Sequence, residues 1–188
     1  MTIGALLDYI VKICFTTSDK GAYALHSLYK SNSAMHETAM KEYIYLKVFF
    51  AQVACARAIE SKAQEKEAHH IMVSIFTKMS EAFKSMPSSL NYGCNEEELA
   101  DRISVYSQVE IADSIDFSAI VQFYKVYVND HSLLHQNQLM VIFSQVYEDM
   151  VNKLASTANG SNGAGCGCTS VIACMSLLFA ALMAMVIL

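Results

Sequence analysis

The pattern of apolar and polar positions along residues 1–157 predicts a body built from α-helices. Apolar side chains recur at three- and four-residue spacing through most of this stretch, and no alternating run bounded by turn residues marks a strand. Helix breakers are rare, because only three of the seven glycines and the one proline precede residue 159. The predicted fold class is all-α, a single bundle of six or seven helices. We expect them at residues 2–16, 19–31, 34–62, 66–86, 96–111, 116–129 and 131–157.

One predicted helix is apolar on nearly every side. Between Tyr43 and Ala56 its strongly polar side chains are Lys47 and Gln52. A helix that is apolar all round is usually buried, and these two polar residues make it a poor membrane span. We therefore expect it to be the central helix of the bundle. Residues 117–128, with several aromatic and β-branched side chains, predict a second strongly buried helix.

Residues 85–95 are predicted to form the main loop of the body. Pro87 and Gly93 interrupt the helical pattern there. Asn95, followed by three glutamates, is typical of a helix N-cap, because its side chain can accept a backbone N–H and the acids face the positive end of the helix dipole. Ser18 and Ser33 are further predicted N-caps.

The last 35 residues of the chain carry no charged side chain. Residues 158–168, rich in Gly, Ser, Asn and Cys, predict a flexible tether. Residues 169–188 would form a helix about 30 Å long, which matches the hydrocarbon thickness of a bilayer. The sequence therefore predicts a C-terminal transmembrane anchor in the lipid bilayer, with residues 1–157 as a cytoplasmic helical domain.

Two alternatives for this tail remain open. It could be a buried C-terminal helix of a soluble protein, or a GPI-attachment signal with its site at residues 159–161. A GPI signal requires an N-terminal secretory signal, and the start of the chain lacks a basic region and carries Asp8 and Lys12 within its apolar run. Lys153, the last charge before the span, favours a cytosolic body under the positive-inside rule. The tail anchor is the favoured interpretation.

Two further features of the tail suggest how it is used. Cys166 and Cys168 lie close to the predicted span, where S-palmitoylation occurs, although the same residues also suit a simple small-residue tether. Ser176, Ala180 and Ala184 recur every four residues, a spacing that lets membrane helices approach closely and self-associate.

Composition and charge exclude some classes of function. The net charge of −5 and the absence of a Lys/Arg cluster argue against nucleic-acid binding, which needs a basic face. The six cysteines do not form the framework of a small disulfide-rich protein, so a reducing compartment is the simpler expectation. We find no phosphate-binding glycine loop, nucleophile elbow or zinc-protease motif, and we predict no cofactor.

Histidine and cysteine provide the remaining candidate chemistry. Glu67 and His70 have the Glu-x-x-His spacing of dimetal helical bundles, and His131 with His135 could supply a second pair of ligands. The polar character of residues 61–70 favours solvated surface side chains instead. Cys94 precedes a helix N-terminus, but the three glutamates that follow oppose a lowered thiol pKa.

The main functional hypothesis is a tail-anchored, non-enzymatic module that binds an unidentified protein partner at a membrane surface. The layout, six or seven helices around an apolar one and a C-terminal anchor, is similar to that of the Bcl-2 apoptosis regulators, which implies binding of partner helices in a groove. The chain has no Trp for that family's Asn-Trp-Gly-Arg signature, and Gln108 stands where the BH3-like string at residues 111–115 needs a leucine. A metal-binding helical-bundle enzyme is the other alternative.

Overall fold

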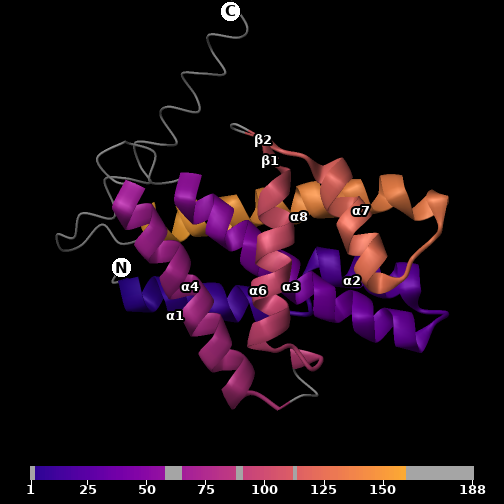
Figure 1. Ribbon diagram of the computed structural model, residues 1–188, viewed down its shortest axis with the longest axis horizontal. Helices are drawn as coiled ribbons and strands as arrows, with labels where there is room; N and C mark the ends of the chain where they lie inside the picture. The colour runs from indigo at the N-terminus through magenta and orange to yellow at the C-terminus, as the bar shows by residue number, and fades with distance from the viewer. Residues whose placement is uncertain (1–2, 58–64, 88–90, 112–113, 160–188) are drawn as a thin grey trace, which may run out of the picture.

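The computed structural model describes residues 3–57, 65–87, 91–111 and 114–159 (Figure 1). Helices make up most of these residues, and the predicted all-α class is confirmed. The helices are α1 (Ile3–Phe15), α2 (Lys20–Tyr29), α3 (Ser33–Arg57), α4 (Glu65–Ser85), α6 (Glu96–Tyr106), α7 (Phe117–Val128) and α8 (Leu133–Asn159).

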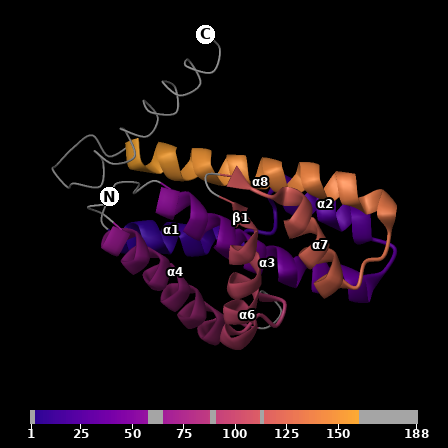
Figure 2. The same ribbon diagram turned by 45° about the horizontal axis from the view of Figure 1, so that its top comes forward.

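Helix α3 is the centre of the bundle. It contacts each of α1, α2, α4, α6, α7 and α8. Figure 2 shows α8 lying across one side of it, with α4 and α6 on the other. Every side chain from Tyr43 to Val53 is buried, so the predicted central helix is confirmed. Its lack of a polar face follows from having neighbours on all sides.

Aromatic rings join α3, α7 and α8 into one core. Phe50 of α3 contacts Phe117 of α7 and Tyr147 of α8, with ring centroids 6.1 and 5.4 Å apart. Tyr124 of α7 packs against Phe143 of α8 at 4.8 Å. Such edge-on contacts add to the free energy gained from burying the rings. The second predicted buried helix is confirmed in part, because α7 buries Ile120, Val121, Tyr124 and Val128 but exposes Gln122 and Val126.

The N-caps agree with the sequence at one helix and shift by one residue at two others. Asn95 caps α6, as predicted, by accepting the N–H of Glu98. The cap of α2 is Asp19, next to Ser18, and its carboxylate accepts the N–H of Ala22 at 2.8 Å. Ser33 is the first residue of α3, and Asn32 before it accepts the N–H of Met35. Asp and Asn are as good N-caps as Ser, so adjacent candidates could not be separated.

The predicted helix 96–111 is too long. After α6 the chain forms a 3₁₀ turn (Ser107–Val109) and a hairpin of β1 (Glu110–Ile111) with β2 (Ser114–Ile115), in which Glu110 pairs with Ile115. Val109 of the 3₁₀ turn and Ile115 of β2 are buried, and Asp116, the next residue, is the N-cap of α7. The BH3-like string of residues 111–115 thus falls on β1 and β2, with residues 112–113 outside the described part.

Candidate protein-interaction surface

One face of α8 exposes apolar and amide side chains without charge. From Leu133 to Tyr147 the helix has no Asp, Glu, Lys or Arg. Leu133 is 83% exposed, Leu134 84% and Val141 55%. Five exposed residues share one side of the helix by their spacing. We call them the α8 stripe: Leu134, Asn137, Gln138, Val141 and Gln145.

The opposite face of α8 is fixed in the core. Leu139, Phe143, Met150 and Leu154 are buried there, and the helix packs against α2, α3 and α7. Because that face cannot rotate outward without exposing these side chains, the stripe has to face solvent. Exposed apolar groups at a rigid position, with charge depleted around them, are typical of protein-binding surfaces.

The start of α8 is held by Asp130. Its carboxylate accepts the hydroxyl of Tyr29 at 2.8 Å and the N–H of Ser132 at 2.9 Å, and His135 Nδ1 lies 2.9 Å from the same group. Burial raises the pKa of Asp130, but these three partners outweigh it and lower the pKa below the ordinary range. The turn that precedes Leu133 is therefore held in a fixed position by Asp130.

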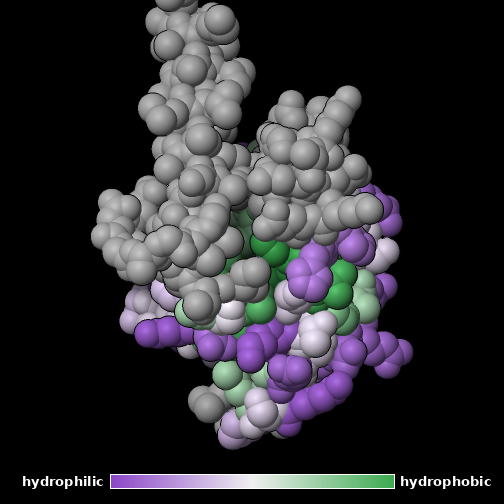
Figure 3. Space-filling model, turned by 90° about the vertical axis from the view of Figure 1, so that its left-hand side faces the viewer, coloured by the Kyte–Doolittle hydropathy of each residue, from purple (hydrophilic) through white to green (hydrophobic). Residues whose placement is uncertain are grey.

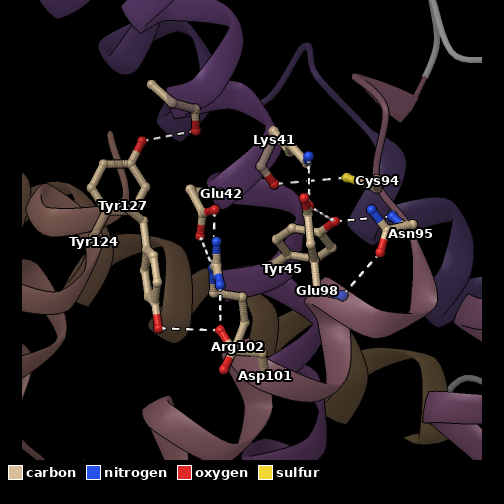
Figure 4. Close-up of polar contacts among 11 residues, drawn as sticks. Lys41, Glu42, Tyr45, Cys94, Asn95, Glu98, Asp101, Arg102, Tyr124 and Tyr127 are labelled. Atoms are coloured by element: carbon tan, nitrogen blue, oxygen red, sulfur yellow. Dashed lines mark hydrogen bonds and ion pairs between the residues drawn. The ribbon is translucent and has the colours of Figure 1, made fainter. Parts of the chain in front are cut away.

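A buried ion pair joins α3 to α6 (Figure 4). Nε of Arg102 lies 2.8 and 3.0 Å from the two carboxylate oxygens of Glu42, and the ring of Tyr127 covers the guanidinium at 3.4 Å. Asp101 contacts Nη1 of the same arginine. Burial raises the pKa of Glu42, and Arg102 opposes that rise without cancelling it. The carboxylate is occupied, so this group fastens helices and offers no free base.

A second polar group joins α3 to the start of α6 (Figure 4). The hydroxyl of Tyr45 donates to Glu98 at 2.7 Å and accepts the N–H of Asn95 at 2.9 Å, while Lys41 pairs with Glu98. Cys94 lies beside them, and burial raises its pKa to about 12. This thiol stays protonated at neutral pH and is a poor nucleophile.

Lys47 fills the corner between α1 and α2. Its side chain is only 1% exposed, and the ammonium donates to the carbonyls of Ile13 and Thr16 and to the carboxylate of Asp19, at 3.2, 2.6 and 3.2 Å. Burial lowers the pKa of Lys47, and Asp19 opposes that effect. The hollow beside Asp19, Tyr43 and Lys47 encloses about 20 Å³, room for one water. All three Lys47 donors are used, so the corner is structural.

The predicted metal candidates are not gathered into one place. His70 is exposed on α4, and the side chain of Glu67 lies outside the described part. His131 lies 2.9 Å from Asn129, and His135 is paired with Asp130. Figure 1 shows α4 and the first turns of α8 at opposite sides of the molecule. In the described part of the chain, no three His, Cys, Asp or Glu side chains group as a metal site.

The other predicted site residues fall on residues 160–188, outside the described part: Cys166, Cys168, Ser176, Ala180 and Ala184. The described helices include none that is long and apolar enough for a membrane crossing. The predicted anchor at residues 169–188 therefore stays a prediction.

The α8 stripe was not predicted from the sequence. A signal for it exists, because fifteen consecutive residues of a predicted helix, 133–147, lack a charged side chain. Apolar periodicity predicted a helix at residues 131–157 and assigned no role to its leucines and amides.

No protein-family model matches the chain, and no curated protein or solved structure is significantly similar to it.

Proposed function

We propose that this chain is a tail-anchored, cytosol-facing helical module that binds a protein partner at a membrane surface and has no enzymatic activity. The observation that carries the proposal is that one helix, α8, combines an uncharged exposed stripe with direct continuation into the uncharged tail. The stripe supports partner binding, and the tail supports a membrane location.

The side of the molecule where α8 ends is consistent with this arrangement. Figure 3 views that side, where α1 also begins, and apolar surface lies at its centre between hydrophilic side chains. Helix α8 ends here at Asn159. The stripe lies in the other half of α8, so a partner would meet the body away from the proposed anchor.

The polar groups within the body support binding over catalysis. Glu42, Glu98 and Lys47 each have close partners inside the protein, and the thiol of Cys94 is kept protonated by burial. Productive active sites instead keep an acid, base or nucleophile facing a substrate cavity. The partner predicted by the stripe is a protein with a matching neutral surface of aliphatic and amide side chains.

Membrane fractionation tests the anchor. Full-length protein is compared with a version that ends at Thr157, both expressed at equal levels. We expect the full-length protein in the carbonate-resistant membrane fraction and the shortened one in the supernatant, because the apolar tail favours insertion by roughly 3–5 kcal/mol. Equal partition of the two versions would contradict the anchor.

Site-specific photo-crosslinking tests the stripe. A photoreactive amino acid is placed at Leu134, at Val141, or at Val151, an exposed apolar position on α8 that lies about 100° around the helix from Leu134. We expect the same adduct from positions 134 and 141 and none from 151. Adducts of equal yield from all three positions would show no preference for the stripe.

A further inference from the structure

Two histidines from different helices meet at the corner between α2 and α3. His26, in the last turn of α2, places Nδ1 3.1 Å from Nε2 of His36, in the first turn of α3. The two rings are nearly perpendicular, with centroids 4.9 Å apart. Only residues 30–32 separate the helices. Regular helix therefore fixes the backbone positions of both histidines, and only their side chains need to adjust to a common ligand.

The separation of the two nitrogens suits a shared metal ion. Nitrogens 3.1 Å apart, each about 2.05 Å from one ion, subtend about 98° at that ion. This angle lies between the about 90° of square-planar and the about 109° of tetrahedral coordination. To bind the ion, both rings would turn about χ2. The lone pairs of the two nitrogens would then point at an ion that lies to one side of the line joining them.

Exposure and protonation also favour a metal ligand role. His26 is exposed and His36 half-buried, so an ion and its waters can reach both. Burial and then His26 lower the pKa of His36, while Glu37 opposes them, so few protons compete for that nitrogen at neutral pH. One of the two rings donates the shared hydrogen bond. When the ion binds, this ring would change tautomer and carry its proton on its other nitrogen, so no proton is released.

We propose that His26 and His36 form a two-imidazole site for a divalent transition-metal ion of the zinc and copper class, completed by water. In the part of the chain that the structure describes, no third His, Cys, Asp or Glu joins them as a ligand set. Because nitrogen ligands bind Cu²⁺ more tightly than Zn²⁺, we expect the affinity of this site for copper to exceed its affinity for zinc. It ties α2 to α3 and does not depend on the proposed function.

Metal titration of the full chain in detergent tests this site. Cys166 and Cys168 are changed to Ser, so that their thiols do not compete for the ion. We expect one Zn²⁺ or Cu²⁺ per chain by calorimetry and a higher melting temperature with metal. His26→Ala and His36→Ala each weaken binding about 100-fold, because the second ligand acts at high effective concentration. The control is His70→Ala, an exposed histidine on α4, which leaves affinity unchanged.

Electron paramagnetic resonance gives a second readout. The Cu²⁺ spectrum should show coupling to two imidazole nitrogens, and to one in either single variant. Circular dichroism of the metal-free variants shows whether they keep the helical fold. The proposal is overturned if folded His26→Ala binds as tightly as the parent, if His70→Ala weakens binding equally, or if no ion binds at one per chain.

Discussion

Helix α3 buries two charged side chains five residues apart, and it satisfies them in different ways. Lys47 uses the carbonyls of Ile13 and Thr16 and the cap residue Asp19. Glu42 depends on a single side chain, Arg102, at the edge of the bundle. The backbone partners of Lys47 cannot move away or titrate, whereas Glu42 can take up a proton if its partner is lost.

This difference separates two kinds of buried charge. Lys47 joins the end of α1 to the start of α2, and its removal leaves carbonyl groups unpaired at a helix end. Glu42 holds α6, and its arginine keeps partial access to solvent beneath Tyr127. We therefore expect the Lys47 corner to be the more sensitive of the two, and four sets of variants test that comparison.

The largest loss should come from Lys47→Met. This change removes three hydrogen bonds while it keeps the apolar length of the side chain, and it should cost about 3–5 kcal/mol of unfolding free energy. Urea unfolding followed by circular dichroism measures it. Lys41→Met is the control, because that lysine forms a partly exposed pair with Glu98 and should cost less than about 1 kcal/mol. Equal losses would contradict the distinction.

Arg102→Met should cost less, about 2–3 kcal/mol at pH 7, and the loss should shrink in acid. Burial already raises the pKa of Glu42, and without the arginine it rises further. A carboxyl with a raised pKa in the folded state binds more protons when folded, so stability increases as pH falls through that pKa, until the unfolded carboxyl is protonated as well. Unfolding at pH 7 and pH 5 checks this. A loss independent of pH would mean that Glu42 stays charged.

Gly21→Ala tests how tightly the Lys47 corner is packed. A methyl group at this position would lie 2.3 Å from Oη of Tyr43 and 2.5 Å from Cγ2 of Val146. We expect a loss of about 1–3 kcal/mol from this overpacking. Gly4→Ala is the matched control, because a methyl there has no neighbour within 4 Å. It should leave stability unchanged or raise it by up to about 1 kcal/mol.

The smallest effects compare two buried tyrosines near the Glu42 pair. The hydroxyl of Tyr124 donates to the carbonyl of Ala39 at 2.8 Å, whereas that of Tyr106 has no hydrogen-bond partner among the described residues. Tyr124→Phe should cost about 1 kcal/mol. Tyr106→Phe should be neutral or stabilising, because it removes a buried polar group. A clear loss for Tyr106→Phe would reveal a bound water or another partner.

The parts of the fold that could be predicted depend on local pattern. The apolar run around Tyr43 predicted the central helix, and Asn95 with its glutamates predicted the start of α6. Both signals lie within one or two helical turns. The pairing of β1 with β2 was missed, because each strand has only two residues and is too short to show an alternating pattern.

The pairs of interacting polar side chains could not be predicted from the sequence for a related reason. Arg102 follows Glu42 by sixty residues, and Tyr29 lies about one hundred residues from Asp130. No periodicity links positions so distant. The His26–His36 contact spans only ten residues, but it crosses a turn whose geometry the pattern did not specify. The anchor, the tether and the lipidation residues remain predictions from composition.

The length of α8 sets how far from the membrane a partner bound to the α8 stripe would lie. Leu134 and Asn159 are 25 residues apart in one helix, a distance of about 38 Å along its axis. The predicted tether adds about 17 Å when relaxed. If residues 169–188 lie in a bilayer, Leu134 is therefore up to about 55 Å from that bilayer while the tether is relaxed. Lengthening or shortening the tether would move this limit without altering the binding surface.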